Sequence, residues 1–327
     1  MADTDGWGEP DSSLTADAAG QLFMIQVFLV GLGAGLAAAL LFASVASGSI
    51  AAIFLFYLAP LPIMIAGLGW SHLAGLIAAA SATAIVAALS GAFLVAVAVI
   101  SFGAWWLAYL TLLARPASNG GGSGLEWYPI GRLIIWAATI GMLVVAAAIP
   151  NFGTDQQTLQ GSLRKIYGRI LHEQSMIDLL VAAVPLAAAV FSTVTNLFNL
   201  WLAARVVKIS GRLSRPWPDL SALTLPPATL GVLALAIAAS LLPDLLGILS
   251  GAGAASLVMV FAVLGLAVLH SITRGMRSRI LVLATMYAAA LVFAWPLLLI
   301  SLVGLAETMF NIRLRIARMR GPPSLRT

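Results

Sequence analysis

Hydrophobic residues in this chain are gathered in long, nearly uninterrupted blocks, and short polar segments separate one block from the next. Roughly 20 consecutive apolar residues suffice for a helix to cross a bilayer, and most of the blocks are about that long. The pattern therefore predicts an all-α bundle of transmembrane helices. The expected spans lie near residues 22–46, 50–69, 73–89, 92–113, 133–148, 177–204, 228–242 and 254–269, and a longer block covers 280–311.

The number of spans depends on two of these blocks. Residues 280–311 are too long for one crossing, and Trp295-Pro296 lies in the middle. We therefore expect two short spans that turn at the outer interface, with Trp295 as the anchor. In the second block, the prolines at 60 and 62 must kink or unwind the helix. About ten spans result, and about eight are the alternative if the segment near Pro60–Pro62 is re-entrant or the last two spans are one.

Basic residues predict the orientation of the chain. A basic cluster directly follows the block at 177–204, and such clusters mark the cytoplasmic end of a span. This span then runs from outside to inside, and we expect both chain termini in the cytoplasm. The cluster consists of Arg205, Lys208, Arg212 and Arg215, and the basic residues expected outside are Arg164, Lys165 and Arg169.

Polar segments divide the chain further. We expect residues 1–20, which are acidic, to be a disordered cytoplasmic tail, residues 21–318 to be the membrane domain, and residues 319–327 to be a basic cytoplasmic tail. The segment 115–131 contains RPASNGGGSG and predicts a flexible linker. On the outer side, residues 151–176 carry an apolar stripe that predicts an amphipathic helix on the membrane surface or over the bundle. The stripe is Leu159, Leu163, Ile166, Ile170 and Leu171.

Composition supports an integral membrane protein. Hydrophobic residues make up 61% of the chain and charged residues 9%, which a soluble domain could not accommodate. The net charge of +5 comes from bases at the ends of apolar blocks, so we expect contact with membrane lipids and not with nucleic acid. The N-terminus lacks the basic region of a signal peptide, so we expect the first span to be retained. There is no cysteine, and we expect no metal and no cofactor.

Polar residues within the apolar blocks are the candidates for function, because a polar group in a bilayer needs a partner. In the sixth span, Ser192, Thr195, Asn196 and Asn199 fall near one side of the helix. They can bind a polar ligand, or they can hydrogen-bond neighbouring helices. In the last span, Glu307 is followed on its face by Asn311 and Arg315. Glu307 can pair with an arginine from the cytoplasmic cluster or lie at the membrane edge, or it can act as a proton-coupling acid or contact a cationic ligand.

Small residues recur at every fourth position of the first span. Such a stripe permits close contact between helices, although the pattern by itself is weak evidence. It can serve packing within the bundle, or it can be a docking face for another membrane subunit. The stripe is Gly31, Gly35, Ala39 and Ala43.

Four stretches carry a resemblance to known proteins: GLGAGLAAALLFA in the first span, FLFYLAPLPIMIAGLGW in the second, NLFNLWLAARVV in the sixth, and GLAETMFNIRLR near the C-terminus. Over about residues 22–318 the chain resembles an uncharacterised family of bacterial membrane proteins that is distantly similar to the substrate-binding S components of energy-coupling-factor transporters. The resemblance implies a helical bundle that captures a small molecule and docks a partner through its first span. S components generally have fewer spans than we expect here.

The sequence contains no catalytic triad, H-E-x-x-H motif or phosphate-binding loop, so we expect no catalytic residue and no enzymatic activity. The leading hypothesis is an S-component-like protein of the bacterial cytoplasmic membrane that binds or transports a small solute or lipid of unknown identity. The alternatives are a scaffold of the cell envelope that contacts other membrane proteins, and a gradient-driven transporter that uses Glu307.

Overall fold

The computed structural model describes residues 12–91, 93–116, 124–293 and 295–319. Most of this part of the chain is helical, and its β structure is one short antiparallel hairpin, β1 (Ala114–Pro116) and β2 (Leu125–Trp127), which confirms the expected all-α class. The helices are α1 (Ser12–Ala43), α2 (Ile50–Tyr57), α3 (Pro60–Gly69), α4 (His72–Leu89), α5 (Leu94–Leu112), α6 (Ile130–Ala148), α7 (Gln156–Tyr167), α8 (Gln174–Ile209), α9 (Ala228–Ala239), α10 (Asp244–Ile272), α11 (Arg279–Val292), α12 (Trp295–Phe310) and α13 (Ile312–Met319), with 3-10 turns η1 (Ser44–Ser47), η2 (Ile149–Asn151) and η3 (Leu220–Ala222).

Seven helical stretches of the described chain are long and apolar enough to cross a membrane. They coincide with the first six expected spans and the eighth, and α2 and α3 together form one of them. The three other expected spans are shorter apolar helices, α9, α11 and α12. The last apolar block does divide into two helices, because α11 ends at Val292 and α12 begins at Trp295. An apolar helical bundle of this kind is compatible with an integral membrane protein.

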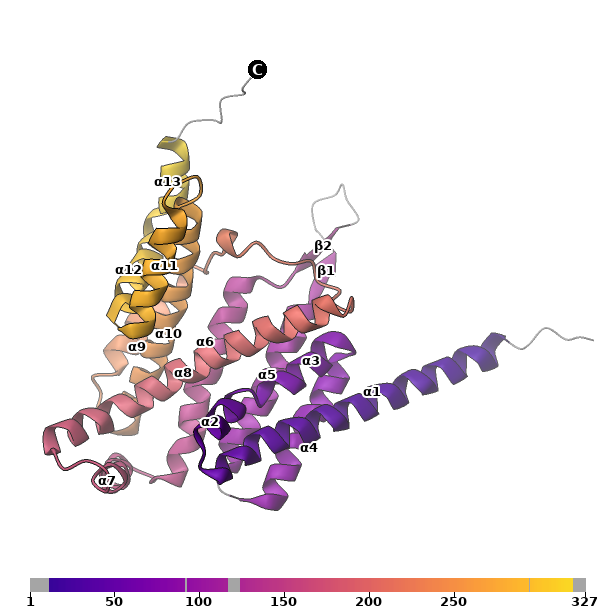
Figure 1. Ribbon diagram of the computed structural model, residues 1–327, viewed down its shortest axis with the longest axis horizontal. Helices are drawn as coiled ribbons and strands as arrows, with labels where there is room; N and C mark the ends of the chain where they lie inside the picture. The colour runs from indigo at the N-terminus through magenta and orange to yellow at the C-terminus, as the bar shows by residue number, and fades with distance from the viewer. Residues whose placement is uncertain (1–11, 92, 117–123, 294, 320–327) are drawn as a thin grey trace, which may run out of the picture.

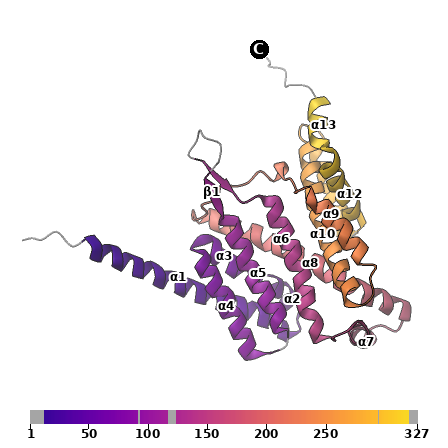
Figure 2. The ribbon, with the colours of Figure 1, turned by 180° about the vertical axis from the view of Figure 1, so that it is seen from behind.

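Helix α8 joins two groups of helices. It packs against α3, α5 and α6 on the side of the N-terminal helices, and against α10 on the side of the C-terminal ones. Each group has its own core, one around Ile63, Met64 and Leu107, and the other around Val260 and Phe261. As Figures 1 and 2 show, α7 lies at one end of the molecule, and the β1–β2 hairpin and α13 lie at the other.

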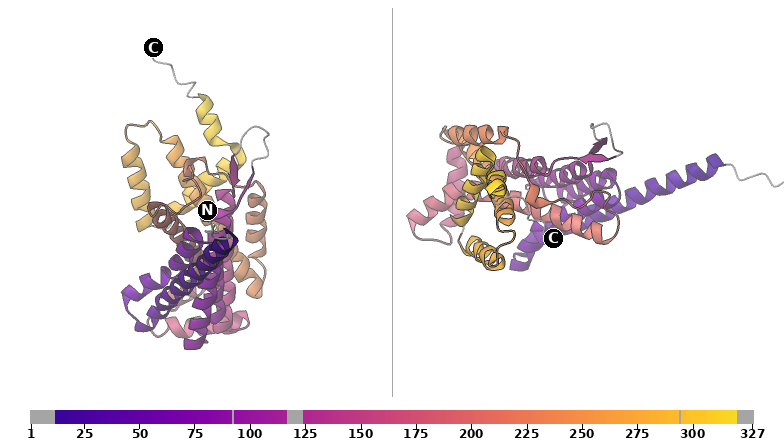
Figure 3. Two further views of the ribbon diagram at one scale, coloured as in Figure 1. Left: turned by 90° about the vertical axis from the view of Figure 1, so that its right-hand side faces the viewer. Right: turned by 90° about the horizontal axis from the view of Figure 1, so that it is seen from above.

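The first helix packs on α4 through its small residues. A Cβ atom on Gly31 would lie 2.8 Å from the Ile77 side chain, and one on Gly35 would lie 2.7 Å from the carbonyl oxygen of Ala78. Ala39 is also buried, whereas Ala43 is exposed. Three of the four stripe residues are therefore used for packing within the chain, and a docking role stays a prediction. The N-terminal part of α1 projects beyond the other helices (Figure 3).

A second close contact between helices was not expected from the sequence. Gly265 of α10 faces the backbone of Ile300, and Gly304 of α12 faces the backbone of Phe261, so that neither glycine has room for a Cβ atom. The backbones of α10 and α12 can approach closely only because both positions lack side chains. This contact holds α12 against α10.

Two expected segment boundaries are wrong. Helix α1 begins at Ser12, inside the segment expected to be a disordered tail; residues 1–11 and 320–327 lie outside the described residues. The segment expected to be a flexible linker, 115–131, begins in the β1–β2 hairpin and ends in α6; β1 and β2 pair in register, and Arg115 forms a 2.9 Å ion pair with Glu126. Its glycine-rich middle, residues 117–123, is also outside the described residues.

The expected outer amphipathic helix is present as α7, but its apolar face is shorter than predicted. Leu159 and Leu163 are buried against α6, α8 and α10, whereas Ile166 and Ile170 are exposed. The helix begins at the capping box of Asp155 and Thr158 and ends at Tyr167, so the predicted stripe continues past the helix end. Helix α7 therefore covers the end of the bundle over about two turns.

Replacing Gly35 by alanine should destabilise the protein by about 1–3 kcal/mol, because the new methyl group must displace the backbone of α4. The measurement is thermal unfolding in detergent. Gly33→Ala is the matched control, since no atom lies within 4 Å of a Cβ atom at Gly33 of the same helix. Alanine there should be neutral or stabilising by up to about 1 kcal/mol. Equal destabilisation by both substitutions would contradict the packing of α1 on α4.

Candidate functional site

The polar face predicted for the sixth span is present on α8 and is turned partly inward. Asn196 is 2% exposed and Asn199 is fully buried, while Ser192 and Thr195 are half-buried. Leucine, alanine and valine dominate the rest of this helix and favour its continuation. The asparagines are thus held at fixed positions by a long helix that also contacts α3, α5 and α6.

Asn199 lies opposite the break between α2 and α3. Pro60 and Pro62 have no N–H group, so the carbonyls of Phe56 and Leu58 accept from the shorter-range donors Ala59 and Leu61, at 3.1 Å and 3.0 Å.

The amide of Leu61 is then no longer available to the carbonyl of Tyr57, its normal partner four residues earlier. Asn199 Nδ2 donates to that carbonyl at 2.8 Å, and also to the carbonyl of Thr195 in its own helix at 2.9 Å. The side chain of Asn199 therefore satisfies a backbone group that the prolines release inside an apolar region.

A cavity of about 650 Å³ lies next to this break. It is partly open to the outside, and it is lined by the ends of α1, α4 and α6, by η1 and α2, by the starts of α3 and α5, and by the middle of α8. Ser192, Thr195 and Asn196 form its polar wall on α8. The other lining residues are Phe42, Ala43, Val45, Ala46, Phe56, Tyr57, Pro60, Val86, Leu89, Ser90, Phe93, Ala96, Val97, Ile100, Val144, Ala148, Ala188 and Phe191.

Asn196 is a lining residue with an unsatisfied hydrogen-bond donor. Its amide nitrogen Nδ2 is buried and has no hydrogen-bond partner among the described residues. One turn further along α8, the buried Oδ1 of Asn199 also lacks a partner in that part of the chain. An unsatisfied buried polar group costs about 1–3 kcal/mol, so a ligand that accepts a hydrogen bond from Asn196 gains from this site.

Among the residues that the structure describes, none that lines the cavity is acidic, basic or a histidine. A charged group would lose its hydration there without gaining a counter-charge. The arrangement therefore favours a neutral, mostly apolar molecule with at least one hydrogen-bonding group.

Glu307, the other predicted candidate, lies away from this cavity and forms a buried ion pair. Its Oε1 accepts from Arg313 Nε at 2.8 Å, and its Oε2 accepts from the Arg313 backbone N–H at 3.0 Å. Arg313 also donates to the carbonyls of Ser221 and Leu223 at 2.6 Å and 2.7 Å. This geometry corresponds to one of the alternatives expected for Glu307, the pairing with an arginine. Through these contacts Glu307 and Arg313 hold α12, α13 and the segment around η3 together.

Asn311 does not continue the face of Glu307. Helix α12 ends at Phe310, and Asn311 takes a left-handed conformation with φ 50° before α13 begins. The expected row of Glu307, Asn311 and Arg315 on one helical face is therefore wrong. Asn311 is exposed at the turn between two helices and does not reach the cavity on α8.

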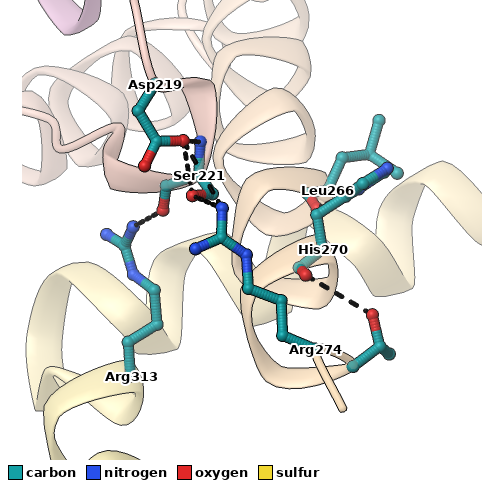
Figure 4. Close-up of polar contacts among 7 residues, drawn as sticks. Asp219, Ser221, Leu266, His270, Arg274 and Arg313 are labelled. Atoms are coloured by element: carbon teal, nitrogen blue, oxygen red, sulfur yellow. Dashed lines mark hydrogen bonds and ion pairs between the residues drawn. The ribbon is translucent and has the colours of Figure 1, made fainter. Parts of the chain in front are cut away.

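A polar network surrounds η3 at the same end of the molecule (Figure 4). Asp219 Oδ1 accepts from the backbone N–H and the hydroxyl of Ser221 at 2.9 Å and 2.6 Å, and it lies 3.6 Å from Arg274 Nη2. The hydrogen bonds from Ser221, and then the charge of Arg274, lower the pKa of Asp219. Arg274 and Arg313 both reach Ser221, so this network fastens the loop before α9 to α10 and α13.

Arg215 has a structural role that the sequence analysis missed. It is 9% exposed and donates to the carbonyls of Thr111 and Tyr128 at 3.0 Å and 2.9 Å. Burial lowers the pKa of its guanidinium. In the sequence it is one member of a basic cluster, and nothing there distinguishes it from Arg205 or Lys208.

The structure thus brings Ser192, Thr195 and Asn196 together at one cavity and leaves Asn199, Glu307 and Asn311 outside its lining. Comparisons of the chain with protein-family models, with curated proteins and with solved structures find no match. The geometry of the cavity is therefore the basis for the function proposed below.

Replacing Asn199 by leucine should lower the stability of the protein by about 1–3 kcal/mol, because the Tyr57 carbonyl loses its side-chain donor. Asn196→Leu is the matched control one turn away. It removes a nitrogen that has no partner in the described chain, so the ligand-free protein should keep or gain stability. Thermal unfolding in detergent compares the two variants, and a similar loss in both would contradict the special role of Asn199.

Proposed function

We propose that this chain is an integral membrane protein, without enzymatic activity, that binds a neutral amphiphilic molecule in the cavity beside Asn196. The observation that carries this proposal is the buried, unpartnered amide nitrogen of a residue that lines a cavity of about 650 Å³. Cavities of this size accommodate a small organic molecule or part of a lipid. The apolar body of the ligand lies among the phenylalanines and alanines of the cavity, and its hydrogen-bonding group meets Asn196.

The proposed binding role agrees with what the resemblance to S components implies, namely capture of a small molecule within a helical bundle. A gradient-driven mechanism based on Glu307 gains no support from the geometry, because that carboxylate accepts two hydrogen bonds from Arg313. A purely structural scaffold gives no reason for an unsatisfied amide at a cavity. Binding of a solute or lipid is therefore the function that the arrangement favours.

We further propose that the protein lies in the bacterial cytoplasmic membrane with about ten crossings and both termini inside. The C-terminal end of α8, which carries Arg205 and Lys208, and helix α13 lie on the side of the hairpin, and α7 lies at the opposite end (Figures 1 and 2). With this orientation we infer that the cavity, which is lined by the ends of α4 and α6 and the start of α5, lies in the outer half of the bilayer.

The orientation can be tested by labelling, since the chain has no cysteine of its own. Lys165→Cys, at the exposed end of α7, should react with a membrane-impermeant maleimide added to intact cells. Arg277→Cys, in the exposed turn after α10, should react only after the membrane is permeabilised. The reverse labelling would place the cavity in the inner half of the bilayer.

Filling the cavity tests the binding role. Ala188 lines the cavity on α8, and Ala188→Phe should reduce the amount of co-purifying ligand, measured by native mass spectrometry, by about tenfold or more, because the ring occupies the ligand volume. Ala187→Phe is the matched control, since Ala187 is an exposed neighbour outside the lining. Asn196→Leu should weaken binding by about fivefold to tenfold through the lost hydrogen bond. A wild-type protein without bound molecules, or equal effects of both phenylalanines, would argue against the proposal.

A further inference from the structure

A second surface of α8, on its exposed side, changes from apolar to basic along the helix. Val194, Phe198 and Trp201 are exposed and follow one another at steps of three and four residues. Arg205 and Lys208 continue the same row at the same spacing. The row therefore presents apolar side chains where the helix is in the membrane and two cations where it ends.

The two cations share one aromatic ring. Arg205 Cζ lies 5.2 Å from the centre of the Trp217 ring, and Lys208 Nζ lies 4.9 Å from it. Neither side chain forms an ion pair with a carboxylate in the part of the chain that the structure describes. Cation–π contacts hold both charges in place, but they leave the repulsion between the two charges uncompensated.

The other charged residues between positions 205 and 228 already have contacts within the chain. Asp219 is the one acid in residues 205–228, and it is occupied by Ser221 and Arg274 (Figure 4). Arg212 donates to the carbonyl of Gly69 at 2.9 Å, and Arg215 is buried. Among the cations of residues 205–228, Arg205 and Lys208 on the last turns of α8 are thus the ones placed to meet an anion from outside the chain.

We propose that this row is a binding site for one anionic phospholipid. The phosphate lies between Arg205 and Lys208, Trp217 supports both cations, and an acyl chain follows Trp201, Phe198 and Val194 along α8. A soluble phosphate would use only the cations and would leave the adjoining apolar row without a partner. The site is separate from the cavity, because none of these residues lines it.

The test is native mass spectrometry of the full chain in detergent with added phosphatidylglycerol, and with phosphatidylcholine for comparison. The double variant Arg205→Ala/Lys208→Ala should bind phosphatidylglycerol about tenfold more weakly, with little change for phosphatidylcholine. The matched control is Lys165→Ala/Arg169→Ala, which removes the same charges from exposed positions at the other end of the molecule. The control should retain wild-type binding. The charge-preserving variant Arg205→Lys/Lys208→Arg should retain most of the affinity.

Three results would overturn the proposal: unchanged phosphatidylglycerol binding in the alanine variant, an equal loss in the control pair, or displacement of the lipid by millimolar inorganic phosphate. Thermal unfolding of both double variants checks that each remains folded. Asn196→Leu should leave phosphatidylglycerol binding unchanged, so failure of this site and failure of the cavity proposal give different results.

Discussion

The hydrogen bond from Asn199 to the carbonyl of Tyr57 is the contact on which the arrangement of the membrane domain depends. A helix interrupted by two prolines leaves a carbonyl without a donor, and inside a bilayer no water can replace that donor. The two residues are 142 positions apart in the sequence, so the bond also joins the N-terminal helices to α8. It fixes the depth at which the broken helix meets α8, and with it the position of the cavity wall.

The cavity follows from the same break. Where α2 ends and α3 begins, the chain cannot pack as a continuous helix against α8. Aromatic rings from α1, α2 and α8, and that of Phe93 just before α5, line the space that remains. Asn199 is used to satisfy the break, whereas Asn196 is a residue of the cavity lining whose buried amide nitrogen has no partner in the described chain. Two asparagines that look equivalent in the sequence therefore have different roles, one in holding helices and one, as we propose, in binding a ligand.

Charged residues at the end of the molecule opposite α7 mainly have a structural role. Arg313 neutralises Glu307 and binds two carbonyls near η3, and Arg215 binds two carbonyls at the ends of α5 and of the hairpin. Such arginines order the loops between spans because one guanidinium can donate to several acceptors. Arg205 and Lys208 differ from them: in the described chain they pack on the aromatic rings of Trp201 and Trp217 and form no ion pair with a carboxylate, which leaves their surface open to an anionic partner.

The sequence by itself determined the helical class, the positions of most spans, the break at Pro60–Pro62, the division of the last apolar block and the polar face of α8, because each depends on a local pattern of apolar residues, prolines or helical spacing. It could not determine which polar residues meet each other. Only the tertiary structure separated Asn196 from Asn199, placed Glu307 in an ion pair with Arg313, and showed that α1 uses Gly31 and Gly35 against α4. These outcomes depend on contacts between segments far apart in the chain, and a local pattern carries no information about them.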